Sequence, residues 1–320
     1  MESPALTVDV PPQPWTGRFD GEGAEHRRWW QAVTPYAGAA SAATPSAGAR
    51  PAVILGFGSD EGVRRNKGRP GAAAAPAAIR AALGPLAFHL DRDVLDAGDV
   101  TVRDASLESG QARAGAAISR LIDAGQLPVV LGGGHETAFA SYLGVAGSAA
   151  VREGLTVGVL NLDAHFDLRD EPVPSSGTPF LQMARAEAAA GRALRYAVVG
   201  ISEPNNTRAL FRTAEELGVE YLLDEDCTAE AAQVFVAAFL AQVDALYLTI
   251  DLDVLPASVA PGVSAPAAYG VPLPVISAVC RQVAASGKLL HLDIAELNPE
   301  FDVDARTAKV AARLVNTLLG

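Results

Sequence analysis

The chain has 320 residues, of which 49% are hydrophobic and 19% are charged, so it can bury a large core and is not a disordered polyelectrolyte. Its net charge of −12 argues against binding to nucleic acid or to an anionic membrane, because both need a basic surface. With only Cys227 and Cys280, it can form neither a disulfide scaffold nor a thiolate zinc module.

The first 51 residues read as an irregular N-terminal extension. They contain prolines at positions 11, 12 and 14, and residues 37–51 form an Ala/Gly/Ser/Pro tract that we interpret as a mobile loop or linker. The first residues lack the basic flank and apolar stretch of a secretory signal. The most apolar later stretch, residues 234–250, is interrupted by Gln242 and Asp244, which argues against a membrane span. We therefore expect a cytoplasmic protein.

Residues 52–320 have the pattern of a single α/β domain, in which short apolar runs alternate with longer segments of helical period. The pattern predicts strands at Ala52–Phe57, Val94–Ala97, Leu127–Leu131, Thr156–Leu162, Tyr196–Ile201, Val219–Leu223, Ala245–Leu252 and Leu289–Ile294. It predicts helices at Ala73–Leu83, Gln111–Ala124, Glu136–Leu143, Thr178–Ala190, Thr207–Leu217, Ala229–Gln242, Pro274–Ala285 and Ala305–Leu319.

This alternation favours a three-layer αβα fold with a central, mainly parallel sheet of about eight strands, because parallel strands need helical crossovers. The runs are apolar throughout rather than alternating, as expected for strands buried on both faces. A closed eight-stranded barrel is the competing topology, since periodicity does not distinguish the two. In both folds the chemistry lies at the carboxyl ends of the strands.

Polar residues of one chemical kind follow three of the predicted strands. The motifs are Gly132-Gly133-Gly134-His135-Glu136, Asp163-Ala164-His165-Phe166-Asp167 and Asp251-Leu252-Asp253. Residues two apart in an extended chain share a face, so Asp163, His165 and Asp167 are expected to point one way, as are Asp251 and Asp253. Grouping them at a buried strand end is unfavourable unless a cation offsets the repulsion and the desolvation.

The charge count indicates two divalent cations. Four aspartates, at positions 163, 167, 251 and 253, carry −4, whereas neutral His135 and His165 carry no charge. Mixed imidazole and carboxylate ligands without thiolate suit Mn(II), with Fe(II), Co(II) and Zn(II) as alternatives. Two such ions sharing a water make a hydrolytic nucleophile at neutral pH. Each motif alone has a simpler interpretation, as a solvated strand end, a helix cap or a magnesium site, and His291 lies within a strand and is interpreted as core.

These motifs resemble those of the ureohydrolase family, which includes arginase and agmatinase. The similarity runs from about Gly56 to Glu300 and includes Gly68-Arg69-Pro70-Gly71 and the segment Asp293 to Pro299. It implies two manganese ions per subunit and self-association. One ion would be held by His135, Asp163, Asp167 and Asp251, the other by His165 and Asp253, with Asp163 and Asp251 bridging the two as catalytic residues. Glu296 would face the amidine-like group of a small-molecule substrate.

Departures from the family pattern favour its formimidoylglutamase branch. Guanidino hydrolases have a histidine before the glycine of the segment that reads Ser175-Ser176-Gly177 here, and they usually have Asp-His-Ser where this chain has Gly134-His135-Glu136. Residues 15–20 and 59–66 are also similar to that branch. The resemblance implies hydrolysis of N-formimidoyl-L-glutamate to L-glutamate and formamide, a step of histidine degradation. The alternatives are a guanidino hydrolase that releases urea, an inactive metal-binding relative and a magnesium phosphatase.

A dianionic substrate entering an acidic protein needs local cations, and arginine is the favoured partner of a carboxylate. Arg169 follows Asp167 by two residues, where arginases place a contact to the substrate α-carboxylate, so we expect Arg169 to bind one carboxylate. Arg64, Arg65 and Arg69 are the candidates for the other. Ser176, solvent or the bridging group would protonate the leaving amine in place of the missing histidine.

Overall fold

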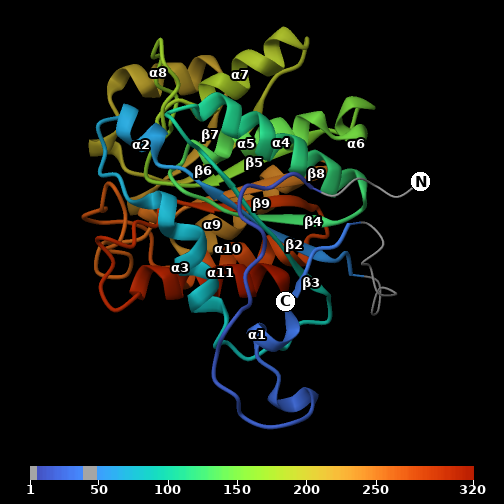
Figure 1. Ribbon diagram of the computed structural model, residues 1–320. Coiled ribbons are helices and arrows are strands. Elements are labelled where there is room, and N and C mark those ends of the chain that lie inside the picture. Colours follow the sequence, from blue (N-terminus) through green and yellow to red (C-terminus); the bar gives the residue numbers. More distant parts are fainter. Residues whose placement is uncertain (1–5, 39–48) are drawn as a thin grey trace.

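The computed structural model describes residues 6–38 and 49–320 (Figure 1). The strands are β1 (Thr34–Pro35), β2 (Ala52–Gly58), β3 (Val94–Thr101), β4 (Leu127–Leu131), β5 (Val157–Leu162), β6 (Arg195–Ile201), β7 (Glu220–Leu223), β8 (Ala245–Asp251) and β9 (Leu289–Ala295). The helices are α1 (Trp29–Ala32), α2 (Glu61–Arg65), α3 (Ala75–Leu83), α4 (Leu107–Asp123), α5 (Thr137–Gly147), α6 (Ala149–Arg152), α7 (Pro179–Ala189), α8 (Arg208–Glu216), α9 (Ala229–Leu240), α10 (Leu273–Ala285) and α11 (Arg306–Leu319).

Within the described residues these strands form one parallel sheet in the order β1-β3-β2-β4-β9-β8-β5-β6-β7. The sheet is open, which excludes the barrel, and the predicted αβα class is confirmed. Within the described residues the sheet has nine strands, one more than the expected number of about eight. The added strand, β1, contributes two residues beside β3, and an element that short has no periodicity to detect. Helix α4 begins at Leu107 rather than at Gln111, and α1, α2 and α6 were not predicted.

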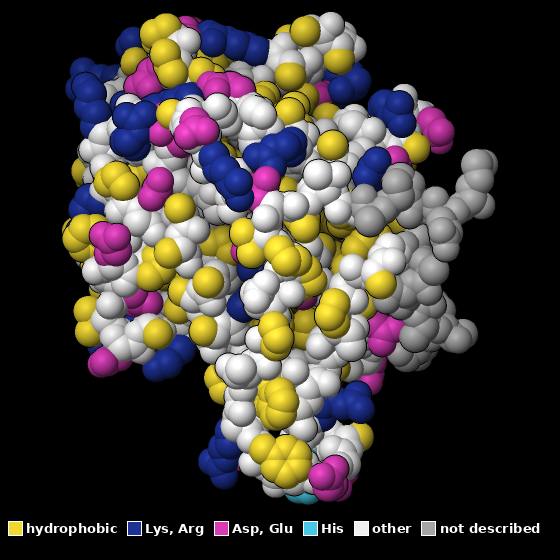
Figure 2. All heavy atoms as spheres, viewed as in Figure 1, with side chains coloured by type: hydrophobic (Ala, Val, Ile, Leu, Met, Phe, Trp, Pro, Cys, Tyr) yellow, Lys and Arg dark blue, Asp and Glu magenta, His cyan; other side chains and the backbone are white. Residues whose placement is uncertain are grey.

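Helices cover both faces of the sheet, as Figure 1 shows. Successive residues of β2 alternate between the layers: Ala52 and Ile54 pack with α3, α9, α10 and α11, whereas Val53 and Leu55 pack with α4, α5, α7 and α8. Both sets are fully buried, which explains why the strands read as unbroken apolar runs. In the described ranges no helix is both long and apolar enough to cross a membrane. Basic and acidic side chains are interspersed on the face shown in Figure 2.

The described part of the N-terminal segment packs onto this core. Trp29 is fully buried and donates through Nε1 to Asn316 on α11 at 2.9 Å, and Val10 forms a bridge to Asp99 on β3. The division of the chain at residue 51 stays a prediction. Of the tract predicted to be a loop, residues 39–48 lie outside the described residues.

The strand order brings the polar motifs together. Strands β4, β9, β8 and β5 are consecutive neighbours in the middle of the sheet, although they are far apart in the chain. Their carboxyl ends lead into His135, Glu296, Asp251 and Asp163 respectively. Because all four strands are parallel, these ends meet at one edge of the sheet, where open α/β folds bind their ligands.

Candidate active site and metal centre

The turn after β4 places His135 by a close backbone approach. The amide of Gly134 donates to the carbonyl of Ser59, at the end of β2, at 2.9 Å. A Cβ atom on Gly133 would lie 1.7 Å from that carbonyl oxygen, so no other residue fits at this position. The run of glycines therefore holds the turn against the neighbouring strand and presents His135 at the edge of the sheet.

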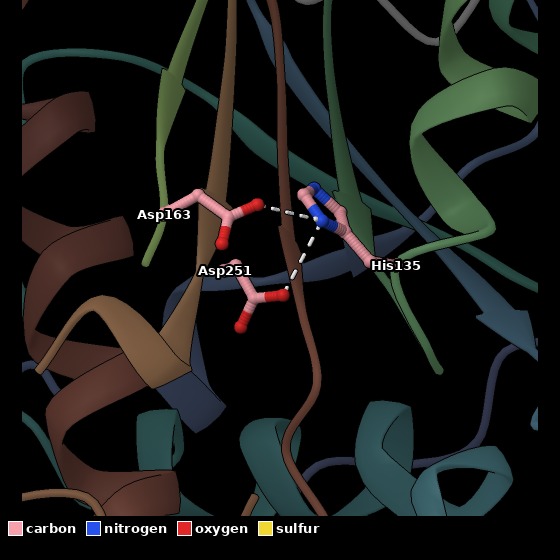
Figure 3. A group of neighbouring side chains, drawn as sticks. All are labelled: His135, Asp163 and Asp251. Carbon is pink, nitrogen blue, oxygen red and sulfur yellow. Dashed lines mark ion pairs between the residues drawn. The ribbon is translucent and has the colours of Figure 1, made fainter. Parts of the chain in front are cut away.

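One nitrogen of His135 faces three carboxylates. Its Nδ1 lies 2.9 Å from Oδ2 of Asp167, 3.2 Å from Oδ2 of Asp163 and 3.3 Å from Oδ2 of Asp251. Figure 3 shows the imidazole pointing between Asp163 and Asp251, which come from the ends of β5 and β8. A single proton on Nδ1 cannot satisfy three acceptors, whereas a metal ion can bind all of these atoms at once.

A second cluster shares Asp163 with the first. Nδ1 of His165 lies 3.1 Å from Oδ2 of Asp253 and 3.5 Å from Oδ1 of Asp163. The two oxygens of Asp163 thus face different histidines, His135 and His165. Ligand atoms of His135, Asp163 and Asp251, and likewise those of Asp163, His165 and Asp253, lie within 4.8 Å of one another. Asp163 could therefore contribute one oxygen to each of two adjacent cations.

The electrostatics of the site favour cations. Burial raises the pKa of Asp251 well above its ordinary value, and neighbouring Asp253 and Asp163 raise it further. Burial opposes protonation of His135, but its hydrogen bonds to Asp163 and Asp167 hold its pKa well above the ordinary value. In the described part of the chain no lysine or arginine pairs with these aspartates. The nitrogen and oxygen donors therefore fit a pair of divalent metal ions.

Residues behind the candidate ligands orient them. Nε2 of His135 lies 3.1 Å from Oγ1 of Thr249, and that hydroxyl donates to Oδ1 of Asp293 at 2.6 Å. The other oxygen of Asp293 accepts from the hydroxyl of Tyr247 at 2.5 Å. Because the Thr249 proton is committed to Asp293, its oxygen accepts from Nε2–H of His135. This tautomer leaves the lone pair of Nδ1 directed at the aspartates, as metal binding requires.

Glu296 closes the site from the end of β9. It adopts a left-handed backbone conformation with φ of 68°, and its amide donates to Gly133 at 2.8 Å. Its Oε1 accepts from the amide of His135 at 2.7 Å, so the side chain is held beside the metal ligands. Burial, reinforced by the charge of Glu136, raises the pKa of Glu296 to about 8. A cationic group bound beside Glu296 would favour its ionised form.

A cavity of about 340 Å³ lies at the carboxyl edge of the sheet, and it is lined by His135, His165, Asp167, Asp251, Asp253 and Glu296. Three of the substrate contacts expected from the sequence, Arg69, Arg169 and Ser176, line it as well. Residues that were not predicted also line it, and they are Asn66, Lys67, Gly68, Asn205, Asn206, Leu210, Ser264 and Ala265. The cavity is therefore wider than the metal motifs and extends over the loop after α2.

The other two predicted arginines do not line this cavity. Arg64 pairs with Glu61 at 2.5 Å and is exposed. Arg65 pairs with Glu61 at 2.8 Å and with Glu108 at 2.7 Å, and it donates to the carbonyl of Pro174. Both guanidinium groups are occupied by carboxylates of the protein itself. Sequence spacing could not show this, because Glu108 is 43 residues away from Arg65.

The orienting residues could have been found from the strand period. Thr249 precedes Asp251 by two residues, and Asn161 precedes Asp163 by two, so each shares a face with a ligand. Asn161 donates from Nδ2 to Oδ2 of Asp163 at 2.9 Å. No such signal exists for Asp293, because its link to His135 runs through the neighbouring strand β8.

Comparison with known proteins gives a consistent result. Residues 50–320 match the model of the Arginase family. A protein of Nocardia farcinica named formimidoylglutamase is 58% identical over 305 residues, covering 95% of each chain. One of Rhodococcus jostii with the same name is 56% identical over 97% of this chain and 96% of its own. The crystal structure of Trypanosoma cruzi formiminoglutamase with Mn²⁺ has a TM-score of 0.77 at 25% identity, covering 87% of this chain and 94% of that one.

Proposed function

This chain is a member of the arginase family, and on that premise we propose that it hydrolyses N-formimidoyl-L-glutamate to L-glutamate and formamide. The observation that carries the proposal is the convergence of two histidines and four aspartates from three strand ends, with no internal cation beside them in the described residues. The choice of substrate rests on relatives named formimidoylglutamase, which align over nearly the whole chain. The alternative of a guanidino hydrolase is not favoured by these relatives.

We assign the metal ligands as follows. His135, Asp163, Asp167 and Asp251 would hold one ion, and His165 and Asp253 would hold the other together with the bridging carboxylates of Asp163 and Asp251. Mn(II) suits this set of imidazole and carboxylate donors, and the T. cruzi formiminoglutamase was crystallised with Mn²⁺. When bound, the metal pair supplies an activated water for hydrolysis and offsets the charge of the aspartates.

The side chains of the protein orient the substrate. Glu296, held beside His135 by the backbone amide of that residue, would face the formimidoyl group and stabilise its positive charge. Arg169 packs across Gly177, where a Cβ atom would lie 2.7 Å from Cδ of Arg169, and would bind a carboxylate of the glutamate part. Ser176 is buried at the cavity wall and accepts a hydrogen bond from Asn66 at 3.1 Å. It stands where guanidino hydrolases have a histidine.

Product analysis after manganese reconstitution tests the proposal. The purified chain is incubated separately with N-formimidoyl-L-glutamate, agmatine, arginine and 4-guanidinobutyrate, and both formamide and urea are measured. We expect formamide from the first compound and no urea from the other three. Release of urea as the main activity would establish the guanidino hydrolase instead, and no turnover of any compound by a fully metal-loaded chain would indicate an inactive relative.

Manganese itself is tested by reconstituting the metal-free chain with Mn²⁺, Fe²⁺, Co²⁺ or Zn²⁺ at equal occupancy, determined by elemental analysis. We expect two ions per chain and the highest turnover with Mn²⁺. A higher turnover with another ion at the same occupancy would reassign the metal and leave the ligand set unchanged.

A further inference from the structure

The proposed substrate carries two carboxylates, yet the cavity already contains the negative charges of the metal ligands and of Glu296. Two positively charged side chains are needed to hold the glutamate part. In the described residues three Lys or Arg side chains line the cavity, namely Lys67, Arg69 and Arg169.

Arg69 is already committed to the protein. Its guanidinium donates to the carbonyls of Val263 and Ser264 and lies 3.9 Å above the ring of Phe301. Two of its five N–H groups are therefore bonded to the loop after β8, and the side chain joins two loops of the cavity wall. Arg64 and Arg65 are paired with Glu61 and do not reach the cavity.

Lys67 and Arg169 differ from these arginines. Within residues 6–38 and 49–320, neither side chain has a hydrogen-bond acceptor or an ion-pair partner, and both are exposed to solvent at the cavity. They are thus the two cations of the cavity wall whose side chains have no partner within the described residues.

The backbone fixes where Lys67 stands. It has φ of 61°, a left-handed conformation that residues other than glycine rarely adopt. On one side Asn66 is joined to Ser176, and on the other Gly68 packs so closely that a Cβ atom would lie 2.5 Å from Oγ of Ser264. The loop is therefore anchored on both sides of Lys67, and this residue projects at the cavity without a local partner.

We propose that Lys67 binds the side-chain carboxylate of the substrate, opposite the α-carboxylate held by Arg169. Arg169 follows the metal ligand Asp167 by two residues and so serves the carboxylate nearer the reacting carbon. Lys67 belongs to the loop between α2 and α3 and serves the distal one. The compact ammonium group acts as a point charge and selects a dicarboxylate over its neutral analogues. This inference rests on the proposed function and deepens it.

The test compares two substrates of equal size that differ in the distal charge, N-formimidoyl-L-glutamate and N-formimidoyl-L-glutamine. Lys67→Met removes the charge but keeps an unbranched side chain at the left-handed position. We expect KM for the glutamate substrate to rise about tenfold, with kcat changed less than about twofold, and KM for the glutamine substrate to stay unchanged. Lys67→Arg should restore most of the lost affinity.

Lys309→Met is the matched control, because Lys309 is exposed on α11, lies outside the cavity and bonds to the carbonyl of Asp304. It should leave KM for both substrates unchanged. An equal rise of KM for both substrates in Lys67→Met, or no rise for either, would overturn the assignment.

A binding experiment distinguishes a failure of the proposed function from a failure of the Lys67 assignment. If the wild-type chain does not hydrolyse formimidoylglutamate, binding of L-glutamate and L-glutamine to the manganese-loaded chain is measured by calorimetry. Tighter binding of L-glutamate that disappears in Lys67→Met supports Lys67 as a carboxylate-binding residue. Equal binding of the two amino acids, or a preference that survives Lys67→Met, rejects it.

Discussion

Two groups of buried aspartates lie on the same sheet and differ in what offsets their charge. At β3, Asp96 accepts two hydrogen bonds from Arg80 at 2.9 Å each and one from Trp15 at 2.8 Å, and Asp99 accepts from Arg80 at 2.6 Å. At the ends of β5 and β8 the aspartates face the imidazoles of His135 and His165 instead.

The comparison separates a structural cluster from a binding site. Around Arg80 each of the two aspartates is bonded to a guanidinium group of the chain itself, so the cluster is complete when the protein folds. At the candidate metal site no lysine or arginine of the described residues pairs with the aspartates, and burial raises the pKa of both Asp251 and Asp253. The chain has therefore kept an unfavourable arrangement of carboxylates that an added cation would relieve, and this is the physical signature of a ligand site.

Asp251→Asn should give the largest effect. It removes a carboxylate that we propose to bind both ions, so we expect manganese content to fall and turnover to drop by more than the about 10–100-fold typical of changes behind the ligands. The folded-state pKa of Asp251 is raised, so ionising this group opposes folding, and the opposition grows as pH rises above its unfolded pKa. The metal-free variant should therefore be more stable than the metal-free wild type at pH 7. Urea unfolding in a chelator, with elemental analysis and turnover assays, checks both.

If the two clusters differ as argued, Asp251→Asn lowers the activity but raises the stability of the metal-free chain. A variant that loses activity and also loses stability in the metal-free state would contradict it, because Asp251 would then be a stabilising residue of the fold. Retention of both ions would remove Asp251 from the ligand set.

Arg80→Met should act in the opposite way, on stability and not on the metal. It leaves Asp96 and Asp99 without their cation, and breaking a buried ion pair costs about 3–5 kcal/mol of unfolding free energy. Arg185→Met is the matched control, since its pair with Asp170 is exposed and should contribute at most about 1 kcal/mol. Urea unfolding measures both. A loss of less than about 1 kcal/mol in Arg80→Met would mean that the two clusters do not differ as argued.

These two clusters also mark how far the sequence could be interpreted. The metal motifs could be found because Asp163 and Asp251 directly follow apolar runs. The extended geometry expected for these motifs was wrong, because β5 ends at Leu162 and Asp253 lies in a 3-10 turn. The Arg80 cluster gave no such signal, since its members come from a helix and a strand with unrelated periods. The ion pairs of Arg64 and Arg65 gave no signal in the sequence either, so these two arginines were expected at the substrate and Lys67 was overlooked.

The fold followed from the alternation of strands and helices, but the order of the strands did not. The sequence places β4 and β5 consecutively, whereas the structure inserts β9 and β8 between them. That insertion assembles the site, because it puts the ends of four strands side by side. Strand order depends on how the helices pack against both faces of the sheet, and single-chain periodicity does not report on that.

His291 can be compared with His135 and His165, because it is a buried histidine that has no carboxylate of the described residues within hydrogen-bonding distance. It is fully buried, its Nδ1 lies 3.1 Å from the carbonyl of Pro128, and burial lowers its pKa to about 4. Because the pKa of His291 is lower in the folded chain than in the unfolded chain, where it is near 6.5, the folded chain loses stability as the pH falls from 6.5 toward 4. This loss in unfolding free energy amounts to about 3 kcal/mol. His291→Asn retains a donor for Pro128 and cannot titrate, so this part of the acid loss should disappear.

The measurement is the unfolding free energy of the metal-free chain between pH 7 and pH 4. The exposed His89, replaced in His89→Gln, serves as the control and should leave the pH dependence unchanged. If His291→Asn loses as much unfolding free energy between pH 7 and pH 4 as the wild type does, His291 does not titrate as its burial implies.

Thr249→Val tests the smallest contribution, the orientation of His135 from behind the site. Valine keeps the shape of threonine but removes the hydroxyl that accepts from Nε2 of His135 and donates to Asp293. Losing such an outer hydrogen bond typically weakens metal affinity by about 10–100-fold. We expect a weaker manganese affinity by competition with a chelating dye, and turnover that recovers at high manganese concentration, because the ligands themselves remain. Thr317→Val, whose hydroxyl bonds only to Arg313 on the exposed side of α11, should change neither quantity. Unchanged affinity in Thr249→Val would mean that the aspartates alone hold His135 in place.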